Sequence, residues 1–212
     1  RRHPGRVLTM PAPGADALVT GRRLALAIGA RRHALFRRLA MAGKGDPNDI
    51  AVAGMCATWA TGGGALPQWM GLPPAMFRKM LRHHFGAAGK EIGGGRIGAS
   101  PDRYNEIADL RDLLLKHRAQ RVPSERWLVE MIATGCMGPD HLWSDLGLMS
   151  RPELSRLMGL NFPCLADQNV HNMRWKRFLY KKLCESEGWY ICRAPTCQEC
   201  SEYTVCYAPH DA

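Results

Sequence analysis

The sequence lacks the short motifs that mark the common enzyme classes. It has no phosphate-binding P-loop, no G-x-S-x-G nucleophile turn, no H-E-x-x-H zinc pattern and no G-x-G-x-x-G dinucleotide turn after a strand. The glycine runs lack those contexts and are therefore interpreted as connections. These absences give no support to a hydrolase, a kinase or a dehydrogenase. We expect a protein that is not a turnover enzyme.

Acidic residues and serine are scarce in the N-terminal part of the chain. Residues 1–44 contain ten basic side chains and one acid, Asp16, whereas the other 168 residues contain 19 basic and 18 acidic groups. The net charge of +10 therefore belongs mainly to the first fifth of the chain. An arginine-rich, acid-poor start resembles a transit peptide, but such peptides are serine-rich and the first serine here is Ser100. We predict a mobile basic arm over residues 1–16 and no secretory signal.

The sequence also lacks an unbroken hydrophobic run. Its longest uncharged stretch, residues 50–77, is long enough to span a bilayer but is interrupted by Gly62-Gly63-Gly64 and by Pro67, Pro73 and Pro74. We interpret it as a buried helix followed by a loop. The expectation is a soluble, cytoplasmic protein with no membrane partner, in a compartment where thiols stay reduced.

Alternating β-type patterns are scarce, and apolar residues recur mostly at helical spacing. The predicted fold class is therefore mostly α, with a helical domain over residues 17–190 and a C-terminal cysteine-rich metal-binding loop. Asp46 is predicted as an N-cap, Ser150 and Glu153 as a capping box with Met149 packing on Leu154, and residues 86–99 as a flexible connection. Helices are expected over residues 17–42 and 172–185, and after Asp46, Pro73, Ser100, Pro123 and Ser150.

Four of the eight cysteines lie close together near the C-terminus, with the spacing C-x4-C-x2-C-x5-C. A short loop brings four sulfurs to one point at little entropic cost, and thiolates are the ligands of iron–sulfur clusters and structural zinc. We therefore predict a metal-binding tail over residues 191–212. The single continuous loop favours an iron–sulfur cluster over zinc without deciding between them, and two disulfides would suit a secreted protein. The predicted ligands are Cys192, Cys197, Cys200 and Cys206.

The remaining cysteines and the histidines carry no motif. Cys56, Cys164 and Cys184 lie among apolar residues and are predicted to be small buried side chains. Cys136 is followed by Met-Gly-Pro-Asp-His141 and could approach a site, but burial is favoured for it as well. The eight histidines are scattered along the chain. Sequence alone assigns them no shared site.

Several segments together resemble one known family. They are GGGALPQWMGLPPAMF, DHLWSDLGL from Asp140 to Leu148, RPELSRLM, NFPCLADQN and NMRWKRFLYKKLC, which leads to the cysteine loop. In this combination the chain resembles the nitrogen fixation protein family NifQ. The resemblance covers roughly residues 50–206 and leaves the basic N-terminus outside.

The resemblance implies a role in molybdenum supply. Members of this family are associated with biosynthesis of the iron–molybdenum cofactor of nitrogenase, and are thought to carry an iron–sulfur cluster that contains or delivers molybdenum. The cofactors implied are an iron–sulfur cluster and molybdenum, and the partners are molybdate and the nitrogenase cofactor-assembly proteins. The family's cysteine motif corresponds to Cys192, Cys197, Cys200 and Cys206 without a change in spacing.

An alternative stays open at this point. A zinc-stabilised nucleic-acid-binding or regulatory protein would also use a four-cysteine loop and a basic N-terminus. The balanced charge outside residues 1–44 does not favour a nucleic-acid partner. Two further groups are expected either near the metal site or in plain structural roles, namely His141, Trp143 and Asp145, and the basic helix residues Arg174, Lys176, Arg177, Lys181 and Lys182.

Overall fold

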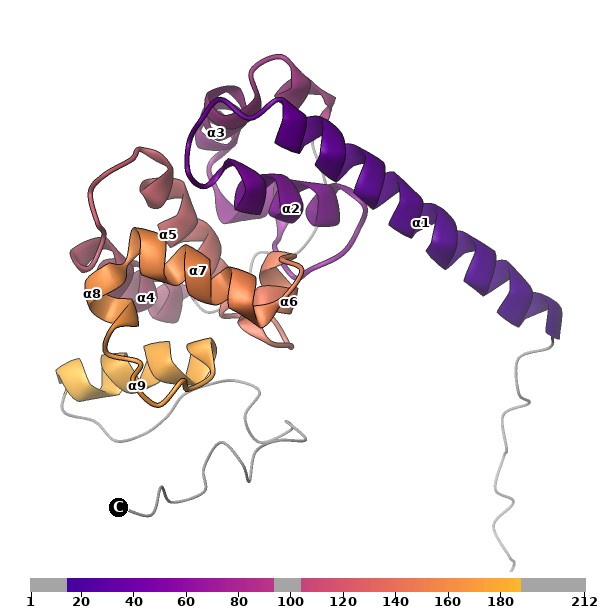
Figure 1. The fold of residues 1–212 in the computed structure, drawn as a ribbon. Helices are drawn as coiled ribbons and strands as arrows, with labels where there is room; N and C mark the ends of the chain where they lie inside the picture. The colour runs from indigo at the N-terminus through magenta and orange to yellow at the C-terminus, as the bar shows by residue number, and fades with distance from the viewer. Residues whose placement is uncertain (1–14, 94–103, 188–212) are drawn as a thin grey trace, which may run out of the picture.

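A computed structural model of the chain describes residues 15–93 and 104–187 (Figure 1). Every regular element in those two ranges is a helix, which confirms the mostly α fold class. The predicted N-terminal arm, apart from its last two residues, and the predicted cysteine-rich loop lie outside the described residues. No described helix is long and apolar enough to cross a lipid bilayer.

The helices follow the predicted starts closely where proline sets them. A proline at the first helical position costs no hydrogen bond and has a helical φ already, so α3 begins at Pro74, and α5 begins just after Pro123. The described elements are α1 (Ala15–Met41), α2 (Asp49–Ala60), η1 (Gln68–Gly71), α3 (Pro74–Phe85), η2 (Ala88–Glu91), α4 (Tyr104–Lys116), α5 (Ser124–Gly135), α6 (Leu142–Leu146), α7 (Arg151–Asn161), α8 (Pro163–Ala166) and α9 (Trp175–Glu187).

The helical body is built around α2, which is apolar on nearly all sides and buried along most of its length. Trp59 of α2 packs on Phe77 of α3, and Trp69 packs on the same ring with centroids 5.6 Å apart. Helices α4, α5, α7 and α9 complete the body around one continuous hydrophobic core (Figure 1). The expectation that residues 50–77 form a buried helix and a loop is confirmed.

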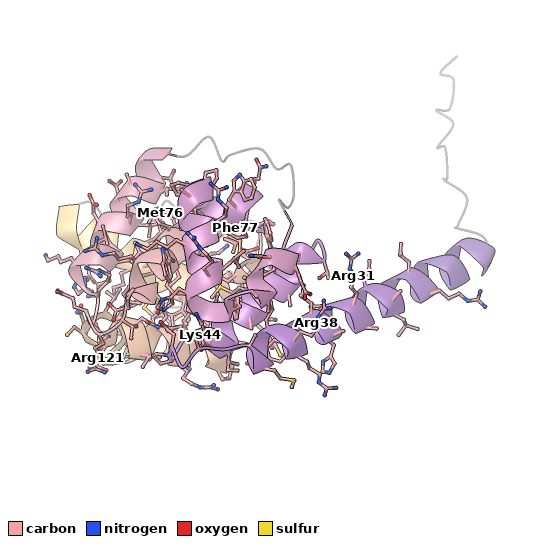
Figure 2. The ribbon with its side chains drawn as sticks, turned by 90° about the horizontal axis from the view of Figure 1, so that it is seen from above. Arg31, Arg38, Lys44, Met76, Phe77 and Arg121 are labelled. Atoms are coloured by element: carbon pink, nitrogen blue, oxygen red, sulfur yellow. The ribbon has the colours of Figure 1, made fainter. Side chains whose placement is uncertain are left out.

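Helix α1 lies only partly on this body. Its last turns contact α2 and bury Leu35 and Leu39, whereas Leu24, Leu26 and Ile28 are exposed. The N-terminal part therefore projects as a single helix, with Arg31 on the projecting part and Arg38 near the body (Figures 1 and 2).

Two predicted helix starts need correction. Asp46 is not the N-cap of α2, because Asn48 takes that position and the Asp46 carboxylate accepts the backbone N–H of Asn48 in a turn ahead of the helix. At α7, Ser150 caps the backbone N–H of Glu153 as predicted. Glu153 reaches back to the N–H of Met149 instead of that of Ser150, and Met149 is exposed, so it does not pack on Leu154.

The predicted flexible connection over residues 86–99 is partly wrong. Its first half contains η2, in which Gly89 is buried against the end of α3. A Cβ at Gly89 would lie 2.8 Å from the Leu81 carbonyl oxygen, so glycine allows this close backbone approach. Residues 94–99 of the connection lie outside the described residues, and so does the predicted helix cap Ser100 that follows them.

The four described cysteines differ in how far they are buried. Cys56 and Cys136 are fully buried, as predicted, and burial raises the pKa of each thiol to about 12. Cys164 is exposed, contrary to the prediction, because the short helix α8 turns Leu165 into the core and leaves Cys164 on the surface. Cys184 is half-buried on α9.

Candidate functional site

Helix α9 leads towards the predicted cysteine ligands, which all lie outside the described residues. Its last described residue, Glu187, precedes Cys192 by five positions in the sequence. Near the start of α9, Lys176 is nearly buried, and its Nζ donates to the Gly138 carbonyl oxygen at 2.7 Å and to the Asp145 carboxylate. Asp145 lies on α6, inside the DHLWSDLGL segment, so a buried ion pair joins two of the segments that carried the family resemblance.

The surroundings of Asp145 are tightly packed. The backbone N–H of Asp140 donates to the Asp145 carboxylate at 3.1 Å, and the Gly138 backbone lies against the same group. Burial raises the pKa of Asp145, and the hydrogen bond from Lys176 acts in the opposite direction. Each of the two buried charged groups therefore depends on the other. Removal of one would leave the other charge buried and unpaired, which is strongly destabilising.

Further contacts hold α9 on the body. The indole Nε1 of Trp175 donates to Ser155 Oγ at 3.1 Å, and the Tyr180 hydroxyl donates to Glu106 Oε2 at 3.2 Å. Phe178 and Leu179 are buried in the core. These contacts come from α7 and α4, so α9 is fixed on several sides before the chain enters the cysteine segment.

The predicted outer basic face of α9 is only partly confirmed. Lys181 is exposed and Lys182 is half-buried, and both lie near Glu185 of the same helix. Lys176 points inward to Asp145 and is structural. Among the other predicted neighbours, His141 is half-buried at the start of α6, and Trp143 packs partly against the core.

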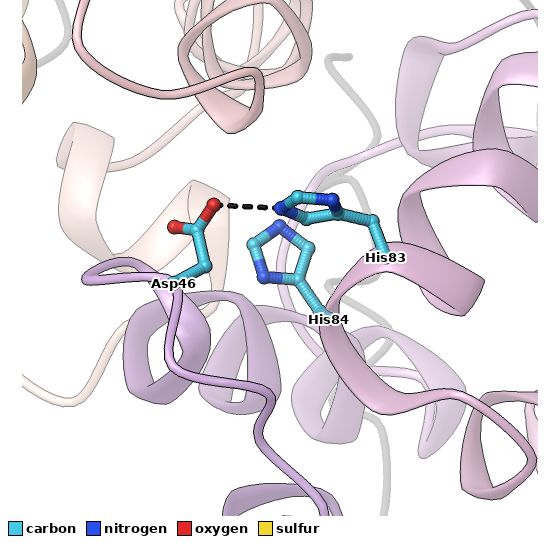
Figure 3. A group of neighbouring side chains, drawn as sticks. All are labelled: Asp46, His83 and His84. Carbon is cyan, nitrogen blue, oxygen red and sulfur yellow. Dashed lines mark hydrogen bonds and ion pairs between the residues drawn. The ribbon is translucent and has the colours of Figure 1, made fainter.

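A second polar cluster lies between the segment before α2 and the end of α3. Within the described residues, Asp46, His83 and His84 form the one group of three side chains whose candidate ligand atoms all lie within 4.8 Å of one another (Figure 3). His83 Nε2 lies 2.8 Å from Asp46 Oδ2. His84 is fully buried, whereas His83 is about one third exposed, so the cluster lies at the edge of the core.

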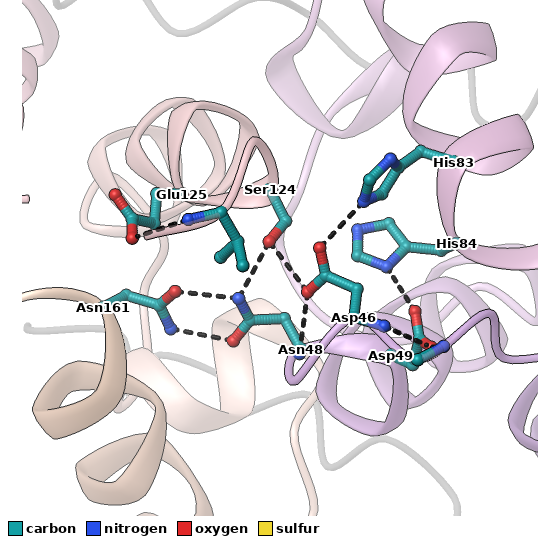
Figure 4. A network of polar contacts seen from close by, with 10 residues as sticks. Asp46, Asn48, Asp49, His83, His84, Ser124, Glu125 and Asn161 are labelled. Atoms are coloured by element: carbon teal, nitrogen blue, oxygen red, sulfur yellow. Dashed lines mark hydrogen bonds and ion pairs between the residues drawn. The ribbon is translucent and has the colours of Figure 1, made fainter. Parts of the chain in front are cut away.

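Asp46 is held in place by the turn ahead of α2 and by the first residue of α5. Its Oδ1 accepts the backbone N–H of Asn48 and the Ser124 hydroxyl, each at 2.9 Å (Figure 4). Burial on its own would raise the pKa of Asp46, but the hydrogen bonds from His83, the Asn48 backbone and Ser124 lower it below its usual value. Asp46 is therefore a preformed carboxylate with one oxygen fully engaged and the other facing the histidines.

The Asn48 side chain extends this network into the core. Its amide exchanges two hydrogen bonds of 2.8 Å with the amide of Asn161 on α7, and it donates to Ser124 Oγ at 2.9 Å (Figure 4). All three side chains are buried. The position of Asp46 thus depends on α2, α5 and α7 together.

The two ring nitrogens of His84 differ in their hydrogen bonding. Its Nδ1 lies 2.7 Å from Asp49 Oδ1, and since a carboxylate only accepts, Nδ1 carries the proton. Burial lowers the pKa of His84 more than Asp49 and Asp46 raise it, which favours the uncharged ring. Nε2 therefore carries a lone pair, and this buried atom has no hydrogen-bond partner.

Sequence reasoning missed this cluster. The sequence predicts Asp46 only as a helix cap and shows the histidines as scattered, because the residues that meet are 37 positions apart. The available signal was the adjacent pair His83-His84 at the end of a predicted helix, together with two aspartates three residues apart. Nothing in the spacing alone says that these segments come together.

Comparisons with known proteins agree with the family resemblance. A family model described as NifQ matches residues 51–208. The chain is 40% identical over 153 residues to "Protein NifQ" of Azotobacter vinelandii, covering 67% of this chain and 78% of that protein. It is 35% identical over 158 residues to "Protein NifQ" of Klebsiella pneumoniae, covering 69% and 90%.

A third relative, "Protein NifQ homolog" of Sinorhizobium fredii, is 46% identical over 102 residues, covering 48% of this chain and 44% of that protein. No solved structure gave a significant match. The family match covers most of the chain, including the α6 and α9 segments that meet at Asp145 and Lys176. The chain therefore belongs to the NifQ family.

Proposed function

We propose that this protein binds an iron–sulfur cluster through Cys192, Cys197, Cys200 and Cys206 and carries molybdenum to the proteins that assemble the iron–molybdenum cofactor of nitrogenase. Membership in the NifQ family supports the broader part of this proposal, a role in nitrogen fixation and in molybdenum processing for that cofactor. The finer part of the proposal, that molybdenum is delivered while bound to an iron–sulfur cluster, rests on the presence of the four cysteines.

The observation that carries the proposal is the extent of the family match. The matched range ends at residue 208 and so includes all four cysteines, whereas the basic residues 1–44 lie outside it. The alternative of a nucleic-acid-binding protein depends mainly on those basic residues. The match therefore favours the cysteine tail as the functional part.

The chemistry of the donor set fits this function. Molybdate is an oxyanion with hard ligands, and its metal must exchange oxygen for sulfur before it enters an iron–sulfur cofactor. Thiolates are soft ligands and hold iron–sulfur clusters. A bound cluster would supply sulfur ligands for the cargo, and the firmly anchored helix α9 would present the cysteine segment from a fixed part of the body.

The test is elemental analysis and a visible spectrum of the full chain, purified anaerobically from cells given molybdate. We expect iron, sulfide and molybdenum with broad visible absorption. Colourless protein with one tightly bound zinc would overturn the proposal in favour of the zinc-stabilised alternative.

Single Cys→Ser variants at the four positions refine the test. If three cysteines hold iron and the fourth holds molybdenum, some variants lose all colour and one loses mainly molybdenum. Four identical outcomes would contradict this division of labour. Cys164→Ser is the matched control, because Cys164 is an exposed cysteine on α8 and its loss should change neither colour nor metal content.

A further inference from the structure

The cluster of Asp46, His83 and His84 is separate from the cysteine motif and has the composition of a metal site. Two imidazoles and one carboxylate are a recurrent ligand set for zinc and for non-haem ferrous iron, with further coordination positions left open. The three candidate ligand atoms lie within 4.8 Å of one another, so small movements of the side chains would bring them to a common ion.

The buried Nε2 of His84, which has no hydrogen-bond partner, is the observation that indicates a bound ligand. His84 is fully buried, its Nδ1 is engaged by Asp49, and its Nε2 has no partner. Figure 3 shows the second ring nitrogen of His84 turned towards the contact between Asp46 and His83. A buried acceptor without a donor is rare in folded proteins, and a cation at this place would satisfy it.

The surroundings resemble the outer shell of a metal centre. Metal-binding histidines commonly donate their other N–H to a carboxylate, as His84 does to Asp49. Asp46 Oδ1 is held by Asn48 and Ser124, which leaves Oδ2 to face the site. Trp127 packs against both imidazole rings, at 5.1 and 5.7 Å between centroids, and supplies an apolar wall.

The charge and the access also suit a cation. Asp46 and Asp49 contribute two carboxylates beside the neutral His84, which matches a divalent ion. His83 is partly exposed and forms the outer side of the cluster, so an ion can reach it from solvent. An anion such as molybdate would instead meet the two carboxylates and be repelled.

We propose that Asp46, His83 and His84 form a second metal site, which binds a divalent first-row transition cation such as zinc or ferrous iron through Asp46 Oδ2, His83 Nε2 and His84 Nε2. Binding replaces the hydrogen bond between His83 and Asp46. The proton leaves His83 Nε2 and solvent returns one to Nδ1, so the ring changes tautomer, the Nε2 lone pair faces the cation and no net proton is released. Metal–nitrogen bonds of about 2.0–2.1 Å in tetrahedral geometry place ligand atoms about 3.3 Å apart. The 2.8 Å contact between His83 and Asp46 then opens by about 0.5 Å.

The test must separate this site from the cysteines, because thiolates are also zinc ligands. The full chain carrying Cys→Ser at positions 192, 197, 200 and 206 is stripped with a chelator and titrated with Zn²⁺ by calorimetry, and with Co²⁺ by absorption. We expect one equivalent to bind, and the Co²⁺ spectrum to lack a thiolate charge-transfer band. Because this background has no cysteine tail, the result does not depend on whether the proposed cluster function is correct.

Variants of the ligands identify the site. Asp46→Asn keeps the shape of the side chain, and His83→Ala removes a partly exposed ring, so both variants can fold even where a change at His84 does not. Each should weaken Zn²⁺ binding by roughly 100-fold or more. Asp49→Asn alters the support of His84 and the hydrogen bonds that the Asp49 carboxylate accepts from the backbone of Gly45 and Asp46, and should weaken binding by roughly 10- to 100-fold.

His117→Ala is the matched control, since His117 is half-buried on another part of the body and its Nδ1 lies 2.8 Å from the Leu113 carbonyl oxygen. It should leave Zn²⁺ binding unchanged, and thermal unfolding of the metal-free variants confirms that they fold. Absence of Zn²⁺ binding in the four-serine background would overturn the proposal. So would binding that survives both His83→Ala and Asp46→Asn.

Discussion

Lys176 of α9 donates to the carboxylate of Asp145 on α6, and both side chains are buried. The pair joins the helix that precedes the cysteine segment to the DHLWSDLGL segment, 31 residues earlier. Lys176 also donates to the Gly138 carbonyl oxygen. One lysine therefore fixes the beginning of α9 against two neighbouring parts of the chain, and its contribution to stability can be measured.

Lys176→Met should destabilise the protein strongly. It leaves the Asp145 carboxylate buried without its cation, a change that typically costs about 3–5 kcal/mol. Because burial already raises the pKa of Asp145, adding Asp145→Asn should recover part of the loss. The free energy of unfolding by urea is measured for the two single variants and the double variant.

The double-mutant cycle should give a coupling energy above about 1 kcal/mol. Lys182→Met is the matched control, because Lys182 pairs with Glu185 at the surface of the same helix and such pairs contribute about 0–1 kcal/mol. Equal losses for Lys176→Met and Lys182→Met would show that the buried pair has no special role.

Gly138→Ala should disturb the same pair from the other side. A Cβ at Gly138 would lie 2.6 Å from Asp145 Oδ1, so the carboxylate must move away from Lys176. Crowding of this kind typically costs about 1–3 kcal/mol. Gly159→Ala in α7 is the control, since a Cβ there meets nothing within 4 Å and should be neutral or slightly stabilising. Urea unfolding of both variants checks the difference, and equal stabilities would contradict the steric account.

The sequence allowed the helices to be predicted well because proline and apolar spacing act locally. The starts of α3 and α5 follow from Pro73-Pro74 and Pro123, and the burial of Leu128 and Ile132 follows from helical periodicity. The cysteine tail could be predicted as a metal site because its ligands lie close together in sequence, and the described residues do not reach it.

The pairings between distant segments could not be predicted in this way. Lys176 had the pattern of an outer basic face, and only packing turned it towards Asp145. His84 and Asp46 meet because α3 packs beside α2, a tertiary contact that no local signal specifies. Cys164 shows the same limit, since which side of the short helix α8 faces the core is decided by Leu165.

The amide pair of Asn48 and Asn161 should be worth more than its two hydrogen bonds suggest. Asn161→Leu leaves the buried Asn48 amide without an acceptor for one N–H and without a donor for its oxygen, which typically costs about 1–3 kcal/mol. The measurement is again the free energy of unfolding in urea. Gln168→Ala, which removes an exposed side-chain hydrogen bond, should change stability by no more than about 0.5 kcal/mol. An equally small effect of Asn161→Leu would mean that water replaces the lost amide.

The described cysteines should differ sharply in reactivity. Thiol alkylation requires the thiolate, and burial raises the pKa of Cys56 and Cys136 to about 12, so raising the pH from 7 to 9 should leave both unmodified in the folded protein. Cys164 is exposed and should react, because the reagent can reach its thiol. Iodoacetamide labelling followed by peptide mass spectrometry measures each site separately, and labelling in urea should modify all three. Rapid modification of Cys136 without urea would show that α5 and α6 open readily, which would contradict the tight packing around Asp145 and Lys176.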